Sequence, residues 1–109
     1  MADHIVIVDD DELLRNRLRD YLANEGFRVT TAESATRFRD IMGRERIDLA
    51  LVDLTMPGES GLSLTRFLRE RSDIAVVILT GKGDPIDRAI GLEVGADDYV
   101  AKPFHPREL

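Results

Sequence analysis

Residues 5–14 read IVIVDDDELL, in which four β-branched apolar residues are followed by four acids and two leucines. The apolar run is typical of a β-strand that is buried on both of its faces. Carboxylates crowded at the end of such a strand repel one another where water solvates them poorly. Two interpretations stay open here: the acids begin a helix, for which Asp11 is the expected N-cap, or a cation lies among them.

The composition is that of an ordinary globular domain. The 109 residues are 43% hydrophobic and 33% charged, which is enough for one domain with its own core. The net charge of −6 argues against nucleic-acid binding by this segment, because a phosphate backbone attracts a basic surface. The absence of cysteine excludes disulfides, thiol nucleophiles and thiolate zinc sites. Neither a signal peptide nor a membrane span is indicated, so we expect a cytoplasmic protein with no membrane partner.

Short β-branched runs alternate with stretches of helical spacing along the whole chain. Such alternation predicts parallel strands joined by helical crossovers, and therefore an open α/β sheet with helices on both faces. The expected strands are residues 5–8, 27–31, 49–52, 75–79 and 99–101, and the expected helices are residues 11–25, 34–42, 60–70 and 85–94.

Polar side chains follow four of the predicted strands, at the edge where ligands bind in sheets of this class. The first and third strands end at Asp9, Asp10 and Asp53, and the fourth and fifth end at Thr80 and Lys102. Taken singly, each residue has an ordinary structural role as a helix cap, a turn residue or a solvated loop residue. Their joint placement at one edge favours a functional site.

Phosphoryl transfer onto a carboxylate requires this set of side chains. Asp53 is the expected nucleophile. A Mg²⁺ or Mn²⁺ ion held by Asp9, Asp10 and Asp53 would relieve the repulsion among the acids and neutralise the incoming phosphoryl oxygens. Lys102 and Thr80 would bind two further phosphoryl oxygens.

Four motifs closely resemble the receiver domain of bacterial two-component response regulators: IVIVDDDELL, LVDLTMPGESG, ILTGKGD and GLEVGADDYVAKPFHPREL. The resemblance covers the whole chain, in order and at matching spacing. It implies one receiver domain over residues 1–109 with a flavodoxin-like, doubly wound, five-stranded parallel sheet of order 2-1-3-4-5. It also implies a regulatory switch that a sensor histidine kinase phosphorylates, rather than an enzyme with a separate substrate.

The resemblance assigns roles at the metal and phosphoryl site. Asp53 matches the phosphorylated aspartate, and Asp9 and Asp10 match the acidic pair. Asp10 would contact Mg²⁺ directly and Asp9 mainly through water, and Thr55 would offer its backbone carbonyl as a further ligand. Thr55 is polar where the OmpR/PhoB-type subfamily, which the C-terminal motif resembles, often has an apolar residue.

The resemblance also assigns the residues that read the phosphoryl group. Thr80 and Tyr99 match the switch pair, and Lys102 matches the phosphate-binding lysine, with a cis peptide bond before Pro103. Gly81 stands where alanine is common.

The C-terminal motif is similar to the OmpR/PhoB-type subfamily, whose receivers precede a winged-helix DNA-binding domain. The runs LTRFLRERS and DRAIGLE resemble its trimethylamine-oxide-responsive branch. This subfamily implies homodimers that form on phosphorylation through a face carrying Arg88, Asp97, Asp98 and Glu108. DNA would be bound by a further C-terminal domain and not by this segment.

The sequence HPREL at residues 105–109 reaches only the first turn of the expected fifth helix, so we expect the chain to be a fragment of a longer regulator with that helix truncated. Burial is worth about 25 cal/mol per Å² of apolar area, so the uncovered sheet face would cost several kcal/mol. The fragment is expected to pair with a second copy through that face or to exchange an element with it.

Three other functions fit the sequence less well. A nucleotide- or flavin-binding domain needs a glycine-rich loop after the first strand, but this chain has DDDE there, which repels phosphate. An aspartyl phosphatase adds an acid two residues after its nucleophile, and position 55 is threonine. A degenerate receiver that serves only as an interaction module would not need all five site residues, which are present.

Overall fold

The structure is a computed structural model that describes residues 3–53, 58–80 and 98–101. The described residues form a parallel five-stranded sheet in the order β2-β1-β3-β4-β5, which confirms the predicted α/β flavodoxin-like fold. The elements are β1 (His4–Val8), α1 (Glu12–Asn24), β2 (Arg28–Ala32), α2 (Ala35–Met42), β3 (Leu49–Asp53), α3 (Gly61–Arg71), β4 (Ala75–Thr80) and β5 (Asp98–Ala101). The predicted fourth helix at residues 85–94 and the start of a fifth lie outside the described residues.

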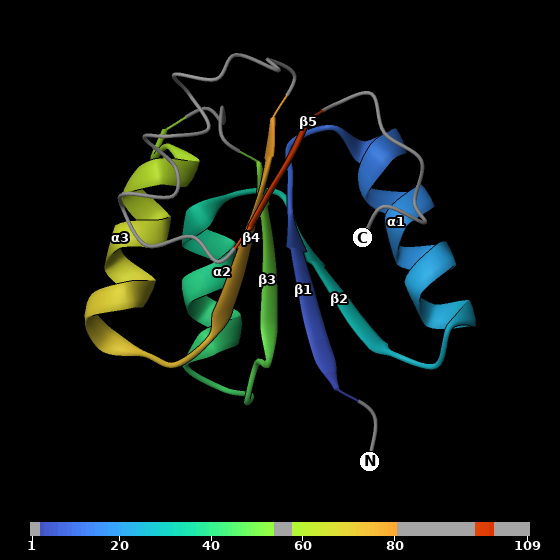
Figure 1. The fold of residues 1–109 in the computed structure, drawn as a ribbon, viewed down its shortest axis with the longest axis horizontal. Coiled ribbons are helices and arrows are strands. Elements are labelled where there is room, and N and C mark those ends of the chain that lie inside the picture. The colour runs from blue at the N-terminus through green and yellow to red at the C-terminus, as the bar shows by residue number, and fades with distance from the viewer. Residues whose placement is uncertain (1–2, 54–57, 81–97, 102–109) are drawn as a thin grey trace.

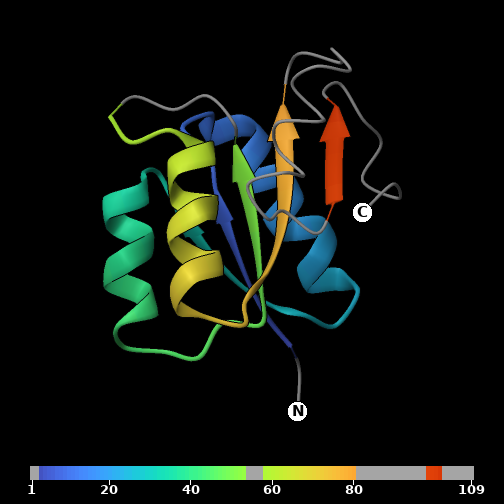
Figure 2. The same ribbon diagram turned by 60° about the vertical axis from the view of Figure 1, so that its left-hand side comes forward.

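The helices that the structure describes are divided between the two faces of the sheet. Helix α1 lies against one face, and α2 and α3 lie side by side against the other (Figure 1). All the strands run in one direction, so their carboxyl ends share the upper edge in Figure 2. Strands β1 and β3 are neighbours in the middle of the sheet, and the residues that follow them therefore lie close together.

Alternate residues of the central strands enter two separate hydrophobic layers, as the pleat of a β-strand requires. Val6 and Val8 of β1 pack with Phe38 of α2 and Leu64 of α3, and all four are fully buried. The residues of the second layer, under α1, are Ile5, Ile7, Leu18, Leu22, Leu51 and Leu79, with Leu49 and Val77 only partly buried beside them. The continuously apolar run of β1 is thus explained by burial on both faces, as predicted.

The end of α1 corrects one predicted boundary. The predicted helix over residues 11–25 ends just before Gly26, which has a positive φ of 98° that residues with a Cβ rarely adopt. The next amide, of Phe27, still donates to the carbonyl of Leu22 in the helix at 3.2 Å. Phe27 therefore belongs to the turn, and the prediction that the second strand begins there is wrong: β2 begins at Arg28.

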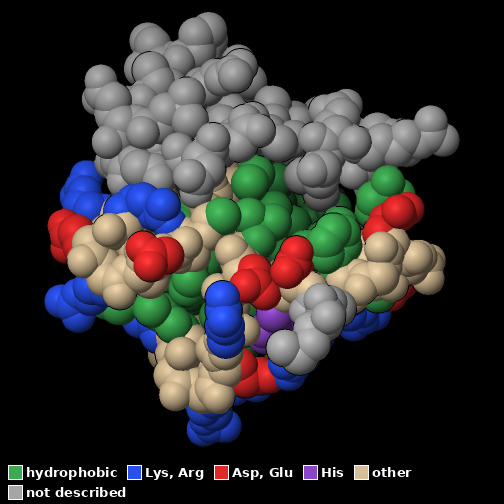
Figure 3. Space-filling model, turned by 60° about the horizontal axis from the view of Figure 1, so that its bottom comes forward, with side chains coloured by type: hydrophobic (Ala, Val, Ile, Leu, Met, Phe, Trp, Pro, Cys, Tyr) green, Lys and Arg blue, Asp and Glu red, His purple; other side chains and the backbone are tan. Residues whose placement is uncertain are grey.

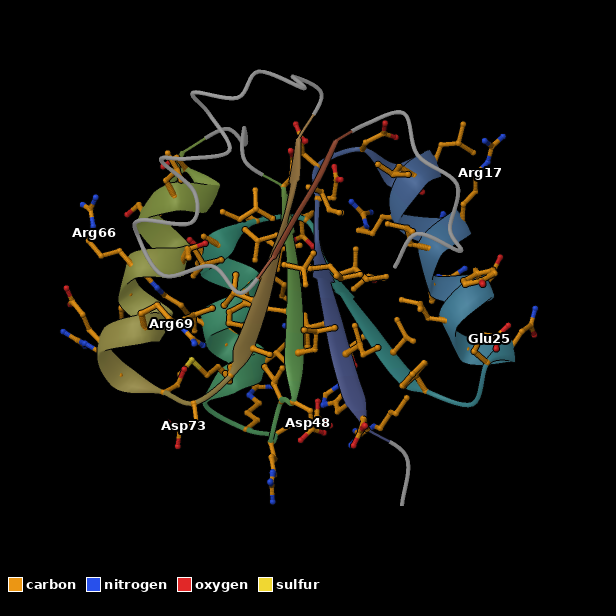
Figure 4. All side chains as sticks on the ribbon, viewed as in Figure 1. Arg17, Glu25, Asp48, Arg66, Arg69 and Asp73 are labelled. Atoms are coloured by element: carbon orange, nitrogen blue, oxygen red, sulfur yellow. The ribbon has the colours of Figure 1, made fainter. Side chains whose placement is uncertain are left out.

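A buried histidine ties the opposite edge of the sheet together. The Nδ1 atom of His4 lies 2.7 Å from the carbonyl oxygen of Arg46, and Nε2 lies 2.7 Å from Oγ1 of Thr30 in β2. The carbonyl can only accept, so Nδ1 carries the proton. The amide of His4 also donates to Oδ2 of Asp48 at 2.8 Å. Figure 3 shows acidic and basic side chains around a histidine on this edge, and Figure 4 labels Asp48 there.

Candidate functional site

Three carboxylates meet at the carboxyl edge of the sheet. Asp53 is the last residue of β3, and Asp9 and Asp10 directly follow β1, its neighbour. One carboxylate oxygen from each residue can be chosen such that all three lie within 4.8 Å of one another. Asp9 and Asp53 are buried, whereas Asp10 is exposed. The structure thus brings together the three acids that the sequence places at the ends of the first and third strands.

Hydrogen bonds to three other residues hold Asp9 in place. Its amide donates to the carbonyl of Ala32 at the end of β2, at 3.1 Å. Its Oδ1 accepts from the amide of Asp11 at 2.8 Å, and its carbonyl accepts from a guanidinium nitrogen of Arg15 at 2.7 Å. The buried acid therefore has a fixed orientation before any ligand arrives, which is the preorganisation that a metal site requires.

Asp11 has the ordinary structural role that the sequence predicted for it. Its backbone is extended, and its side chain accepts a hydrogen bond from the amide of Leu14 at 3.1 Å, which makes it the N-cap of α1. Asp11 is exposed and is not among the clustered acids. Of the four consecutive acids, two therefore join the site, one caps the helix, and Glu12 begins the first helical turn.

The Asp11→Ala variant is expected to lose about 1 kcal/mol of unfolding free energy, because an amide at the start of α1 loses its acceptor. Asp11→Ser keeps a capping oxygen and should stay close to the wild type. Urea unfolding monitored by circular dichroism measures both variants. Equal loss in the two variants would show that the charge of Asp11, rather than its capping bond, stabilises the helix.

Hydrogen bonds and an ion pair hold residues 58–60, the described part of the segment between Asp53 and α3. Gly58 has a positive φ of 81°, and Ser60 caps α3 by accepting from the amide of Ser63 at 3.2 Å. The Glu59 carboxylate binds Arg39 of α2 at 2.7 Å and accepts from the Ser63 hydroxyl at 2.8 Å. The ion pair is partly solvent-exposed and contributes little stability by itself, but it links the loop beyond the site to α2.

The acid cluster fits a small divalent cation. Magnesium prefers oxygen ligands at about 2.1 Å, so two ligands on opposite sides of the ion are about 4.2 Å apart. A cluster whose oxygens lie within 4.8 Å is close to that span and suits carboxylates that bind directly or through a water molecule. Asp9, Asp10 and Asp53 are the residues that would hold Mg²⁺, and the ion would supply positive charge against the phosphoryl oxygens.

The structure describes only some of the other predicted site residues. Thr80 ends β4 and pairs with Ala101 of β5, and Tyr99 pairs with Ile78, so the backbone register of these two strands is described. Asp98 begins β5, opposite Val77. Six further predicted residues lie outside the described residues: Thr55, Arg88, Asp97, Lys102, Pro103 and Glu108.

Sequence reasoning missed Arg15. The residue lies in the first turns of α1, where the helix dipole disfavours a positive side chain. A basic residue at that position, four residues after the capping Asp11, was a signal that the guanidinium has an acceptor at the preceding strand end. The contact with the carbonyl of Asp9 supplies that acceptor.

The response regulator receiver domain family matches residues 5–109. The chain is a receiver domain. This match confirms the predicted family and, with it, a regulatory role in two-component signalling. It also sets aside the nucleotide-binding and flavin-binding alternatives, which the acidic loop after β1 had already made unfavourable.

The TorCAD operon transcriptional regulatory protein TorR of Escherichia coli (strain K12) is 49% identical over 109 residues, which are all of this chain and 47% of the relative. The receiver domain therefore spans about half the length of the curated relatives it matches. Its relatives are transcriptional regulators of the OmpR type, and the predicted likeness to the trimethylamine-oxide-responsive branch is confirmed.

Two solved structures show the same fold. The receiver domain of the TMAO respiratory system response regulator TorR has a TM-score of 0.91 and 48% identity, covering 97% of this chain and 88% of that one. The beryllofluoride-activated receiver domain of Klebsiella pneumoniae RstA has a TM-score of 0.91 and 31% identity, covering 97% and 91%.

The helices that the structure describes are short and polar on one face. Among them, none has the length and apolar character that crossing a membrane requires.

Proposed function

We propose that this receiver domain accepts one phosphoryl group on Asp53, in a Mg²⁺-dependent transfer from the phosphohistidine of a sensor histidine kinase. The observation that carries the proposal is the convergence of Asp9, Asp10 and Asp53 at one edge of the sheet, with Asp53 fixed at the end of a central strand. Membership of the receiver family and the similarity to a beryllofluoride-activated receiver support it.

The transfer follows from the chemistry of a carboxylate nucleophile. An oxygen of Asp53 attacks the phosphorus, the bond from phosphorus to the imidazole nitrogen breaks, and a mixed anhydride forms on the aspartate. Asp53 ends a buried strand, so little reorganisation is needed to present its carboxylate. Asp9 and Asp10, together with Asp53, would hold Mg²⁺, and its charge would offset the repulsion between the anionic nucleophile and the phosphoryl group.

Thr80 and Lys102 are proposed to bind phosphoryl oxygens, and Thr55 to offer its carbonyl to Mg²⁺. The pairing of Thr80 with Ala101 supports the first part, because it brings the ends of β4 and β5 to the same edge as Asp53. Thr80 and Tyr99 are proposed as the switch pair. This pair would have two conformations, and phosphorylation would shift the population toward the one in which the phosphoryl group makes better contacts.

The proposed output is dimerisation through the face carrying Arg88, Asp97, Asp98 and Glu108, an assignment that rests on the resemblance to the OmpR/PhoB-type subfamily. In the longer protein, paired receivers would bring two DNA-binding domains onto neighbouring half-sites and regulate transcription. We place this activity in the cytoplasm, as for receiver domains in general. Slow hydrolysis of the aspartyl phosphate would reset the switch.

Titration of the domain with beryllofluoride in the presence of Mg²⁺ tests the proposal, since this anion mimics a phosphoryl group on a carboxylate. We expect bound ¹⁹F resonances that saturate at one equivalent and disappear when EDTA is added. The same samples, studied by analytical ultracentrifugation, are expected to sediment faster when beryllofluoride is bound. Absence of bound resonances would contradict phosphoryl acceptance, and unchanged sedimentation of a saturated sample would contradict dimerisation alone.

A further inference from the structure

A guanidinium group restrains the backbone between Asp9 and Asp10. Arg15 is half-buried on α1, and its Nη1 donates to the carbonyl oxygen of Asp9 at 2.7 Å. Hydrogen bonds from a charged donor are among the stronger ones in proteins. We propose that Arg15 is a positioning residue for the divalent cation, an inference that rests on the proposed function and adds a determinant of metal affinity to it.

The planar peptide bond between Asp9 and Asp10 connects the contact of Arg15 to the position of Asp10. The carbonyl of Asp9 and the amide of Asp10 belong to one rigid plane, which also includes the Cα atom of Asp10. Arg15 fixes that plane from the carbonyl side, and the end of β2 fixes the preceding amide, of Asp9, through Ala32. The direction in which the exposed Asp10 leaves the backbone is therefore set by Arg15.

Asp10 gains the most from this restraint. Asp9 and Asp53 are buried among neighbouring side chains, whereas Asp10 is exposed. An exposed carboxylate loses conformational freedom when it binds an ion, and that cost falls when its backbone is already oriented. Without Arg15, the loss of conformational freedom at Asp10 on binding is larger, so the affinity of the site for Mg²⁺ should fall.

The charge of Arg15 acts in the opposite direction. A positive group beside the acids repels a cation, so removal of the charge alone should strengthen Mg²⁺ binding. The positioning role predicts weaker binding and the purely electrostatic role predicts tighter binding. The sign of the change therefore distinguishes the two.

Arg17 provides a matched control. It lies on the same helix, carries the same charge, is exposed, and points away from the rest of the molecule in Figure 4. Arg17→Gln removes one positive charge from α1 without touching the Asp9 carbonyl. Arg15→Gln removes the same charge together with the hydrogen bond.

The experiment is isothermal titration calorimetry of Mg²⁺ into the wild type, Arg15→Gln and Arg17→Gln, with circular dichroism to confirm that each variant is folded. We expect Arg15→Gln to bind Mg²⁺ about tenfold more weakly, the loss typical of groups that orient metal ligands. Arg17→Gln should bind as tightly as the wild type or slightly more tightly. If Arg15→Gln does not fold, Arg15→Met, which keeps an apolar stem, carries the same prediction.

Two results would overturn the inference. Equal or tighter Mg²⁺ binding by folded Arg15→Gln shows that the guanidinium does not position the site, even if the variant is less stable. A wild type that binds no Mg²⁺ removes the proposed function together with this inference, whereas a wild type that binds normally beside an unaffected Arg15→Gln removes the inference alone.

Discussion

The Asp53→Asn variant is expected to accept no phosphoryl group when it is incubated with Mg²⁺ and acetyl phosphate, whereas the wild type gains the mass of one. The amide of asparagine has nearly the shape of the carboxylate but lacks the anionic oxygen that attacks phosphorus. Asp53 is the acid of the cluster that ends a central strand, and it is 6% exposed. Intact-mass spectrometry of the two proteins measures the difference.

A matched carboxylate serves as the control for this loss. Asp73 is exposed in the segment between α3 and β4, at the far edge from the acid cluster, and Figure 4 labels it there. Asp73→Asn should accept phosphate as fully as the wild type. Stoichiometric uptake by Asp53→Asn would show that another residue is the acceptor, and equal loss in both variants would point to a general effect of charge.

Magnesium is expected to stabilise the wild type and to leave Asp10→Asn nearly unchanged. A ligand that binds only the folded state raises the unfolding free energy by about 2.7 kcal/mol when its concentration is about 100 times Kd. The exposed Asp10 contributes one of the three clustered oxygens, so its loss should remove most of that gain. Urea unfolding with Mg²⁺ and with EDTA measures it.

The stability of Asp10→Asn without metal tests this second prediction independently. In EDTA, Asp10→Asn should be at least as stable as the wild type, because one of three mutually repelling carboxylates has become neutral. If the variant keeps the full Mg²⁺ stabilisation, the ion binds elsewhere on the chain. If the variant is destabilised in EDTA and unaffected by Mg²⁺, Asp10 stabilises the metal-free fold.

The fold was predictable because its periodicities are strong. The run Ile5–Val8 has no polar position, which indicates a strand covered on both faces, and the structure buries both sides of it. The boundaries were less predictable, as Phe27 shows. Its aromatic side chain favours a strand, but its amide completes the turn that ends α1. Local hydrogen bonding decided that boundary, and composition carries no signal for it.

The part of the site that lies at the strand ends was predictable from the sequence. Asp9, Asp10 and Asp53 follow adjacent parallel strands, so topology alone brings them to one edge. Arg15 was not predicted, because its contact depends on how α1 turns back over the end of β1. The same holds for His4, whose bonds join β1 to β2 and to the segment before β3. Such contacts depend on tertiary packing. The basic residue early in α1 indicates that its guanidinium has an acceptor nearby, but the sequence alone does not identify that acceptor.

The most direct test of the account is chemical identification of the phosphorylated residue. Wild-type protein phosphorylated with acetyl phosphate and Mg²⁺ is reduced with borohydride, which converts an aspartyl phosphate to homoserine, and is then digested and sequenced by tandem mass spectrometry. We expect homoserine at position 53 and unmodified aspartate at positions 9 and 10. Homoserine at Asp9 or Asp10, or a phosphoryl group that survives reduction on a serine or threonine, would contradict it.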